Sequence, residues 1–501
     1  MKILMVEAEC GALPGGKVGG MGDVLAEVPP ALSAAGHDVH VVLPSYGVFH
    51  VDAPVHLNSA ARFAGTEQKF TLYRLPDVQP GVHHWVIDHP VFASPAGKIY
   101  HHDGAGAPFS TDGNLYALFS ASVARCLSDG AWGEPDVLHL HDWHAAGVLL
   151  FRDELPVRRT VFTIHNLGLQ GQRPLQGHPS AFASWFPEID CPPSAIDPRF
   201  PDCYNPMRFG ICASDRVHVV SPTYAREVVQ PDGDFLHGGE GLEADLQAAE
   251  AQGRLIGILN GCAYSEVQQP RIKLLDAVSE QLRAWIAGSD TVPSTHGLAL
   301  RNVDNLRRKR KPLRLITSVT RVTDQKVQLL RTAVDDEGTA ALDRLLASLS
   351  PYDAYVLLGS GDPDLERFLV EVSARHENFV FLNGYSEHLA DPLYAQGDVF
   401  LMPSTYEPCG ISQMLAMAQG QPCIVHAVGG LADTVRDGVD GFVFSGRDAV
   451  DAARAMLQRT DEALAMQVGD PDAWVEVCRQ ARGRRFLWAD TAEQYGARLY
   501  S

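Results

Sequence analysis

The sequence predicts an α/β protein built from two doubly wound parallel-sheet domains in series. With 501 residues, the chain is long enough for two large domains. Short apolar runs typical of buried strands alternate with helical or turn segments in both halves. Glycine-rich or polar turns directly follow many of these runs, which is where open α/β sheets bind their ligands.

The first half begins with a β-loop-α-β unit. Residues 2–6 (KILMV) predict a buried strand, and a glycine-rich loop over 11–23 follows it. A helical pattern over 24–35 ends at Gly36, after which residues 39–43 predict the neighbouring strand. Later apolar runs predict further strands of this sheet at 136–140, 160–164 and 216–220.

The second half repeats this organisation. Short apolar runs predict a second parallel sheet, with strands at 313–319, 355–358, 379–382, 399–402 and 422–425. Residues 262–312 are polar, irregular in pattern and rich in helix breakers. We therefore expect the domain boundary near Asn260-Gly261.

Composition limits the possible partners and the compartment. The chain carries 41 basic and 61 acidic residues, a formal net charge of −20. This charge argues against nucleic acid or an anionic membrane as a partner, because both present phosphates that it would repel. The nine cysteines are scattered without a C-x-x-C pair, as expected of reduced thiols. No apolar run approaches the ~20 residues of a membrane-spanning helix, so we expect a soluble, cytoplasmic protein.

The loop Lys17-Val-Gly19-Gly20-Met-Gly-Asp23 lies between the first strand and the first helix. Glycines let backbone amides approach a phosphate, the helix N-terminus adds partial positive charge, and Lys17 adds a full charge. The loop matches neither the dinucleotide fingerprint nor a Walker loop. Taken alone, it is explained equally well as a phosphate contact or as a flexible turn.

Two histidine-containing segments follow predicted strands of the first sheet, HLHDWH (139–144) and HN (165–166). Their spacing does not suit zinc ligands on one helix face, and no cluster of cysteine or histidine lies nearby in the sequence. We interpret them as strand-end loops that line a substrate site through Asp142, His144 and His165. A structural role for the histidines is the alternative.

Two cations follow the first strand of the second sheet, Arg321 and Lys326, on a loop that runs into a helix. Each would contribute roughly 4 kcal/mol against a charge 4 Å away at an effective dielectric near 20. We interpret them as a clamp for a leaving diphosphate that needs no metal ion, with a solvated basic turn as the alternative. The D-x-D at 362–364 matches a metal motif of other transferases but is better explained as the start of a helix.

Glu407 follows the predicted strand 399–402, where its carboxylate can accept hydrogen bonds from sugar hydroxyls. Gly429-Gly430 forms a comparable turn after the strand 422–425. Every candidate therefore lies at the carboxyl end of a predicted strand. In a parallel sheet these ends share one edge, so the candidates are expected to share a site.

Together these motifs resemble the bacterial glycogen synthase and plant starch synthase family. The combination of EPCG with GGLADTV, and of HNLxxQG with the N-terminal K-x-G-G, is highly specific. The matching segments run in family order across nearly the whole chain: KVGGMGDV (17–24), HLHDWHAA (139–146), FTIHNLGLQG (162–171), VVSPTYARE (219–227), LNG (259–261), RVTDQK (321–326), LGSGD (358–362), GY (384–385), EPCG (407–410) and GGLADTV (429–435).

The resemblance implies two Rossmann-like domains that face each other across a deep cleft, the GT-B fold. Residues 1–260 would form the acceptor side and residues 261–483 the nucleotide-sugar side, with a last helix in 484–501 packing back onto the first domain. The implied reaction transfers glucose from ADP-glucose or UDP-glucose to the non-reducing end of an α-1,4-glucan. It retains the anomeric configuration and requires no metal or other cofactor.

The resemblance also assigns roles by position. The implied catalytic residues are Lys17, His165, Arg321, Lys326 and Glu407. The implied substrate-binding residues are Gly19, Gly20, Asp23, Asp142, Asn166, Asn260, Gly384, Tyr385, Cys409, Gly410 and Ser412. In this assignment the glycine loop approaches the distal phosphate and the sugar, the two cations bind the diphosphate, and the first-domain Asp and His line the glucose pocket.

Three positions depart from the family pattern. Ala263 stands where the family usually has Asp, Val327 replaces a Gly, and Leu415 stands where related transferases have a ribose-binding Glu or this family often has Tyr. The last departure leaves the preference between ADP-glucose and UDP-glucose open. The alternatives are a related GT-B transferase with a different acceptor and a non-catalytic glucan-binding relative. The sequence does not fix the oligomeric state.

Overall fold

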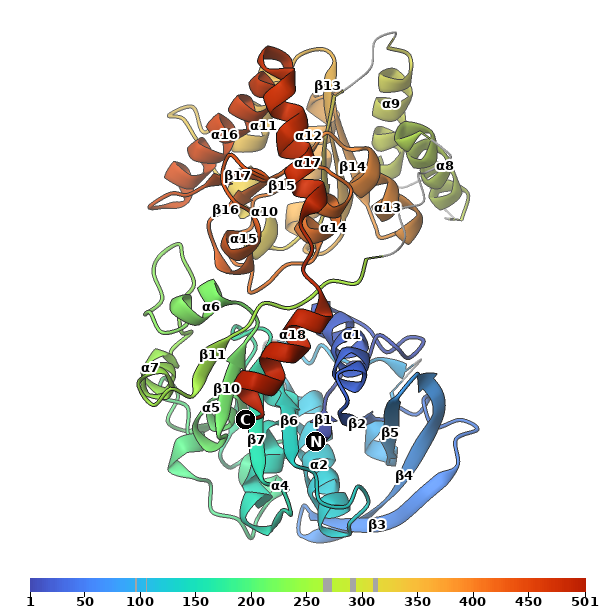
Figure 1. Cartoon of the computed structure of the whole chain (residues 1–501), viewed down its shortest axis with the longest axis vertical. Coiled ribbons are helices and arrows are strands. Elements are labelled where there is room, and N and C mark those ends of the chain that lie inside the picture. Colours follow the sequence, from blue (N-terminus) through green and yellow to red (C-terminus); the bar gives the residue numbers. More distant parts are fainter. Residues whose placement is uncertain (95–96, 105, 265–272, 289–293, 310–313) are drawn as a thin grey trace. The chain divides into compact units, whose positions relative to one another are not determined.

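The computed structural model describes residues 1–94, 97–104, 106–264, 273–288, 294–309 and 314–501. The chain divides into two compact units (Figure 1). The first unit comprises Met1–Asp232, Gly238–Ala263 and Leu487–Ser501. The second unit comprises Gly233–His237 and Tyr264–Phe486. Each unit is built around its own mostly parallel sheet, so the predicted fold class is confirmed.

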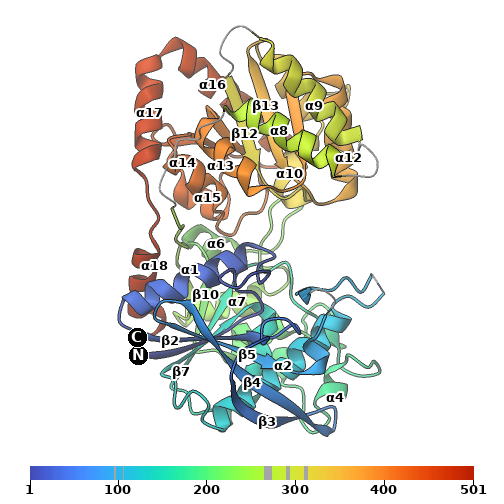
Figure 2. The same ribbon diagram turned by 90° about the vertical axis from the view of Figure 1, so that its right-hand side faces the viewer.

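The sheet of the first unit has nine strands in the order β11-β10-β7-β6-β1-β2-β5-β4-β3. Seven of them are parallel, and β3 and β4 add an antiparallel hairpin at one edge (Figure 2). The strands are β1 (Lys2–Val6), β2 (Asp38–Pro44), β3 (Val55–Phe63), β4 (Thr66–Gln79), β5 (Val82–Asp88), β6 (Val137–His141), β7 (Arg159–Ile164), β10 (Arg216–Val219) and β11 (Leu255–Gly257). A separate two-stranded sheet pairs β8 (Arg173–Pro174) with β9 (Cys203–Tyr204).

The α-helices of the first unit are α1 (Gly20–Ala34), α2 (Ser110–Ser128), α3 (Asp142–Ala146), α4 (Phe182–Trp185), α5 (Pro206–Ala213), α6 (Pro222–Glu227), α7 (Glu243–Ala251) and α18 (Trp488–Gln494). Short 3₁₀ helices cover η1 (Pro90–Phe92), η3 (Gly147–Glu154) and η4 (Pro193–Ala195), and η5 (Tyr495–Leu499) is a π-helical turn. Helix α1 begins at Gly20 rather than at the predicted residue 24, because the glycines of the loop form its first turn.

The second unit has six parallel strands in the order β14-β13-β12-β15-β16-β17. Counted along the chain, this is the 3-2-1-4-5-6 order of a doubly wound sheet, with its switch point between β12 and β15. The strands are β12 (Arg314–Val319), β13 (Asp353–Gly359), β14 (Phe379–Asn383), β15 (Val399–Met402), β16 (Cys423–His426) and β17 (Gly441–Phe444). The predicted first strand began at residue 313, which lies outside the described residues.

The helices of the second unit are α8 (Leu274–Ala287), α9 (Ser294–Arg307), α10 (Asp324–Arg331), α11 (Ala341–Ser348), α12 (Pro363–Arg375), α13 (Glu387–Gln396), α14 (Ser412–Ala418), α15 (Gly429–Thr434), α16 (Ala449–Gly469) and α17 (Pro471–Gly483). Helices α8 and α9 lie where the sequence predicted only irregular structure. Helix α8 buries Leu274, Val278 and Leu282, one residue per turn on a single face. The polar and breaker-rich sequence on either side of the helix hid this stripe.

Both faces of the second sheet are buried. In β13, Tyr355 and Leu357 point into one apolar core, while Val356 and Leu358 point into the other. A strand buried on both sides has no polar face, which explains why the strands of this unit read as continuous apolar runs. No helix in the described part of the chain is long and apolar enough to cross a membrane.

The last residues of the chain complete the first unit. Helix α18 packs against α1, and both termini lie side by side within this unit in Figure 1 and Figure 2. A Cβ on Gly261 would lie 2.6 Å from the Trp488 ring, so glycine is required where the chain passes this helix. The Thr491 hydroxyl donates to the Leu259 carbonyl at 3.0 Å.

A buried chain of hydrogen bonds ties Tyr500 to three strands. The Ile258 carbonyl can only accept, so His218 Nε2 donates to it at 3.3 Å and His218 Nδ1 accepts from Thr163 at 2.9 Å. Thr163 Oγ1 then accepts from His139 Nε2 at 2.6 Å, and the Tyr500 hydroxyl donates to His139 Nδ1 at 2.9 Å. Burial lowers the pKa of His218 to about 3 and that of His139 well below its usual range, so both rings are neutral, as this proton order requires.

Replacing Tyr500 with phenylalanine is expected to lower the free energy of unfolding by about 1–3 kcal/mol, because His139 Nδ1 is left buried without a donor. Urea unfolding of the whole chain measures the change. The matched control is Tyr352→Phe at an exposed position, where a change within about 0.5 kcal/mol is expected. Equal stability of the two variants would show that the hydrogen-bond chain does not stabilise the fold.

Candidate active site

The glycine loop of the first unit runs from the end of β1 into α1. Lys17 Nζ forms an ion pair with Asp23 Oδ1 at 2.6 Å, so two predicted site residues meet here. Both side chains are partly exposed, and such a pair is easily exchanged for a ligand. Helix α1 has Gly19 at its N-cap position and no side-chain cap. Its first amides, starting with Gly20, are therefore open to an anion.

Asp142 follows β6 directly and has an unusual backbone conformation. Its φ is +53°, in the left-handed region that is costly for a non-glycine residue. The carboxylate is almost fully buried, and Oδ1 accepts the amide hydrogen of His165 at 2.7 Å. Burial raises the pKa of Asp142 to about 7, while hydrogen bonds from the amides of His165 and Asn166 act in the opposite direction. The left-handed backbone and the raised pKa of its carboxyl make Asp142 a candidate functional residue.

His165 directly follows β7, beside Asp142, and lies next to a second histidine. Its Nε2 lies 3.0 Å from His141 Nδ1, and the two rings stack with centroids 5.3 Å apart. Burial lowers the pKa of His165 to about 3, with His218 adding to the effect. The ring is therefore neutral near pH 7 and serves as a hydrogen-bonding group rather than as an acid. Strand β6 extends one residue beyond the predicted end at 140, so His139 and His141 both lie within it and are fully buried.

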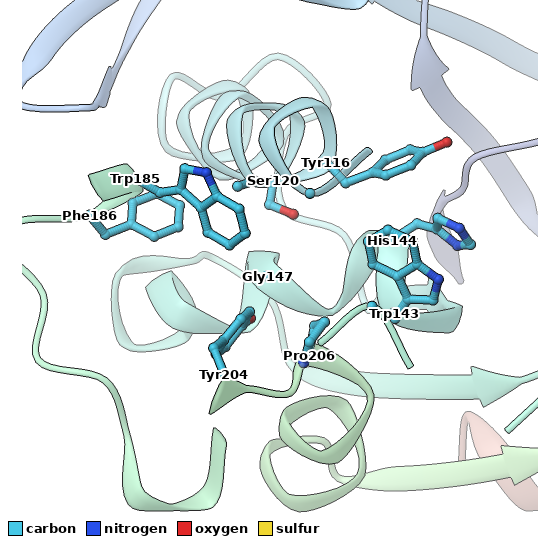
Figure 3. A pocket seen from close by; sticks show the side chains of 12 residues that line it. Tyr116, Ser120, Trp143, His144, Gly147, Trp185, Phe186, Tyr204 and Pro206 are labelled. Carbon is cyan, nitrogen blue, oxygen red and sulfur yellow. The ribbon is translucent and has the colours of Figure 1, made fainter. Parts of the chain in front are cut away.

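Aromatic side chains support the residues that follow Asp142. A small cavity of about 20 Å³ lies beside Trp143 and His144, with Trp185, Phe186 and Tyr204 on its other walls (Figure 3). It has room for about one water molecule and not for a sugar. These rings fix the start of α3 by packing. His144 was predicted to line the substrate site. Its ring instead packs against the Tyr116 ring within this group of aromatic side chains.

In the second unit Lys326 and Glu407 form a buried ion pair. They lie beyond the carboxyl ends of β12 and β15, which are neighbours in the sheet. Lys326 Nζ is 2.5 Å from Glu407 Oε2 and also donates to the Tyr406 carbonyl at 3.3 Å. The Ser404 hydroxyl donates to the same Glu407 oxygen at 3.3 Å. Arg321, on the loop after β12, is exposed and has no ion-pair partner among the described residues.

The loop that carries Glu407 packs directly against the loop of Gly429-Gly430. A Cβ on Gly429 would lie 2.0 Å from the Glu407 carbonyl oxygen, and one on Gly430 would lie 2.2 Å from the Cys409 oxygen. The Gly430 amide donates to the Glu407 carbonyl at 3.0 Å. The EPCG and GGLADTV segments are therefore one structural unit, and its glycines are required by contact between the two backbones.

The other predicted ligand residues are scattered over both units. The Asn166 side chain accepts from the Gly168 amide at 3.0 Å and so shapes its own turn. Asn260 is buried. Gly384, at the end of β14, precedes Tyr385, which is 64% exposed. In the Glu407 loop Cys409 is buried and Gly410 has a φ of +79°. Ser412 opens α14 and accepts from the Tyr394 hydroxyl at 3.2 Å.

The departures from the family pattern have structural explanations. Val327 is buried in an apolar core beneath α10, which a glycine would not fill. Leu415 packs against the other apolar core and offers no polar atom to a ribose. Ala263 is exposed at the end of the first unit. Asp362, in the D-x-D segment, accepts from the amides of Asp364 and Leu365 and so caps α12.

Among the described residues, Asp38, His40 and His83 form a group with metal-ligand atoms within 4.8 Å of one another. The Trp85 indole donates to His40 Nδ1 at 3.2 Å, and Arg74 lies 3.1 Å from His83 Nδ1. Both Nδ1 atoms therefore accept, which places the protons on the Nε2 atoms that face Asp38. A metal-bound histidine has the opposite arrangement, with its second nitrogen donating to an acceptor.

Sequence reasoning missed the carboxylate that holds the glycine loop. Glu9 follows β1 and is 3% exposed. Its Oε2 accepts the amide hydrogens of Val18 at 2.7 Å and Gly19 at 2.8 Å, and its Oε1 accepts from the Tyr100 hydroxyl at 2.7 Å. The available signal was a pair of acidic residues, Glu7 and Glu9, directly after a buried strand.

Comparison with known families matches both halves of the chain. Residues 2–248 match the family model described as starch synthase catalytic domain. Residues 337–462 match the one described as glycosyl transferases group 1. The chain is 33% identical to a glycogen synthase of Gloeobacter violaceus, covering 100% of this chain and 98% of that protein. It is 32% identical to a glycogen synthase of Lactobacillus acidophilus, covering 99% and 98% of the two chains.

Two solved structures are similar over the whole chain. The catalytic domain of starch synthase IV from Arabidopsis thaliana, bound to ADP and acarbose, aligns with a TM-score of 0.76 and 26% identity. That alignment covers 100% of this chain and 98% of the plant domain. HepE of Anabaena in complex with UDP-glucose aligns with a TM-score of 0.52 and 15% identity over 100% and 99% of the two chains, a likeness that shows the fold alone.

Proposed function

The chain belongs to the glycogen and starch synthase family of GT-B glucosyltransferases, and from this premise we propose that it transfers glucose from ADP-glucose to the non-reducing end of an α-1,4-glucan. ADP-glucose is the preferred donor in this proposal because the similar plant starch synthase structure holds ADP. UDP-glucose is the alternative donor. The reaction needs no metal and retains the anomeric configuration.

The buried pair of Lys326 and Glu407 carries the proposal. Burial of two opposite charges is costly unless each has a partner, and here each is the main partner of the other. An arriving diphosphate can replace Glu407 as the partner of Lys326, which frees the Glu407 carboxylate to accept hydrogen bonds from glucose hydroxyls. Arg321, exposed on the loop between β12 and α10, then adds a second cation for the diphosphate.

The first unit supplies groups suited to a sugar. We propose that the Asp142 carboxylate and the neutral His165 ring bind glucose hydroxyls, since both are held in place by other groups of the protein. Lys17 exchanges its partly exposed partner Asp23 for the distal phosphate. Gly20 contributes a backbone amide at the start of α1.

The proposed reaction takes place on one face of the glucose ring. The bond between the anomeric carbon and the diphosphate oxygen breaks, and a bond to the acceptor's 4-hydroxyl oxygen forms on the same side. The hydroxyl proton passes to the departing diphosphate. Lys326 and Arg321 stabilise the charge that grows on this leaving group, which is the main catalytic contribution of the protein in this proposal. A glucosyl-enzyme adduct trapped on Glu407 would overturn the same-face mechanism.

Release of nucleoside diphosphate tests the function. Purified protein is incubated with ADP-glucose or with UDP-glucose, each with and without glycogen and each with and without a chelator. We expect ADP release that depends on glycogen, proceeds faster than UDP release and is unaffected by the chelator. Release without glycogen would indicate a different acceptor, and no release from either donor would indicate a non-catalytic relative.

A further inference from the structure

The glycine loop already holds an anion that belongs to the protein. Two consecutive backbone amides, those of Val18 and Gly19, converge on one oxygen of Glu9 at 2.7 and 2.8 Å. Consecutive amides that point at a common centre are the arrangement by which such loops bind phosphate. In this chain the centre of that arrangement is occupied by a carboxylate that is 3% exposed.

The surroundings of Glu9 fix it in this position. The Tyr100 hydroxyl donates to its other oxygen at 2.7 Å, and burial together with the Glu9 charge raises the pKa of Tyr100, so that Tyr100 stays a donor. A Cβ on Gly22 would lie 2.9 Å from Glu9 Oε2, so glycine at that position makes room for the carboxylate. Three donors and a glycine therefore fit one side chain, which indicates a built site rather than a chance contact.

We infer that Glu9 is a positioning residue of the glucosyl transfer. Its carboxylate accepts hydrogen bonds from the Val18 and Gly19 amides and thereby fixes the loop in a conformation in which Lys17 and the first amides of α1 face the donor. The inference rests on the proposed function. The donor's distal phosphate is bound by the Lys17 ammonium and the Gly20 end of the helix, and not by the amides at the centre of the loop. Loss of Glu9 leaves the loop free to collapse around a phosphate in an unproductive position.

The test compares four variants of the full chain, each checked for folding by circular dichroism and thermal unfolding. Glu9→Ala removes the acceptor. In Glu9→Gln the side-chain oxygen can still accept the loop amides, and the side-chain NH2 can donate to the Tyr100 oxygen. Tyr100→Phe removes one donor to Glu9. Glu7→Gln is the matched control, because it makes the same carboxyl-to-amide change on the same buried segment, at a side chain other than the one that accepts the Val18 and Gly19 amides.

We expect Glu9→Ala to lower kcat with ADP-glucose by about 30- to 100-fold, as misplacement of a binding group by an ångström does. The KM for the donor should change much less than kcat. Hydrogen exchange of the amides in residues 17–22 should become faster. Glu9→Gln and Glu7→Gln should stay close to wild type in both measurements, and Tyr100→Phe should fall between the two extremes.

The outcomes separate the inference from the proposed function. An inactive wild-type chain would reject the proposed function, while the exchange data would still report whether Glu9 holds the loop. With an active wild type, unchanged kcat in Glu9→Ala would overturn the inference. Equal losses in Glu9→Gln and Glu9→Ala would also overturn it, because the charge itself would then act. If Glu9→Ala does not fold, unchanged exchange and turnover in Tyr100→Phe overturn the inference.

Discussion

Replacing Lys326 with alanine is expected to lower kcat on the order of 10²–10³-fold, because one of the cations that stabilise the leaving diphosphate is lost. The same change is expected to lower the free energy of unfolding by about 3–5 kcal/mol, since it leaves Glu407 as a buried charge without its partner. Steady-state release of ADP measures the first effect, and urea unfolding measures the second.

Two controls separate the chemistry from the stability of the pair. Arg331→Ala removes a cation from the same helix, but its partner Asp324 is exposed and 3.3 Å away, so stability should change by less than about 1 kcal/mol and kcat should not change. The double variant Lys326→Met with Glu407→Gln removes both charges and should be more stable than Lys326→Ala, yet at least as slow, because the Glu407 carboxylate is lost as well. Wild-type turnover in Lys326→Ala would show that Lys326 does not stabilise the leaving diphosphate.

Replacing Asp142 with asparagine is expected to make the chain less active and, at alkaline pH, more stable. The loss of the carboxylate should lower kcat on the order of 10²-fold, because the hydrogen bonds that glucose hydroxyls donate to a charged acceptor are lost. Asparagine keeps an acceptor for the His165 amide and tolerates the left-handed backbone at this position. Turnover with ADP-glucose and glycogen measures the catalytic effect.

The effect on stability depends on pH with a defined sign. The pKa of Asp142 is raised from its usual 3.8 to about 7 in the folded chain, so the unfolded chain loses this proton first as pH rises. The carboxylate therefore destabilises the fold increasingly from pH 3.8 to about 7 and by a constant amount above that value. Between pH 4 and pH 8 the variant should gain about 4 kcal/mol relative to wild type.

Thermal unfolding of both proteins at several pH values checks this expectation. Asp398→Asn is the matched control, since burial raises the pKa of Asp398 too but this residue precedes β15, at the opposite end of the strand from Glu407. It should show a pH-dependent gain in stability without loss of turnover. A difference between Asp142→Asn and wild type that does not vary with pH would contradict the raised pKa.

The parts of the fold that depend on a continuous apolar pattern could be predicted from the sequence. Five of the six strands of the second sheet, β12 to β16, were predicted in this way, and β13 for example is buried on both faces, whereas β17 was not predicted. The hairpin β3–β4 was missed because it lies at a sheet edge, where β3 has a single buried residue, Ala61, and no apolar run. Helix α8 was missed because only one of its faces is buried and it lies within a polar, breaker-rich segment.

The candidate residues could be found from the sequence, but their partners could not. Lys326 and Glu407 were each assigned to a different part of the donor, and nothing in the sequence indicated that they pair with each other. The left-handed backbone of Asp142 and the hold of Glu9 on the glycine loop depend on burial and on contacts between residues distant in the chain. Local patterns do not contain this information.

The neighbouring termini make this chain a candidate for circular permutation. Because Leu487–Ser501 belongs to the same unit as Met1–Ala263, a short linker between Ser501 and Met1 would join two segments of one folding body. A permuted gene that starts at the codon for Leu487 would then encode the first unit as one continuous stretch, interrupted only by Gly233–His237, which belong to the second unit. The natural order of the chain instead delays completion of this unit until the ribosome has synthesised Leu487–Ser501.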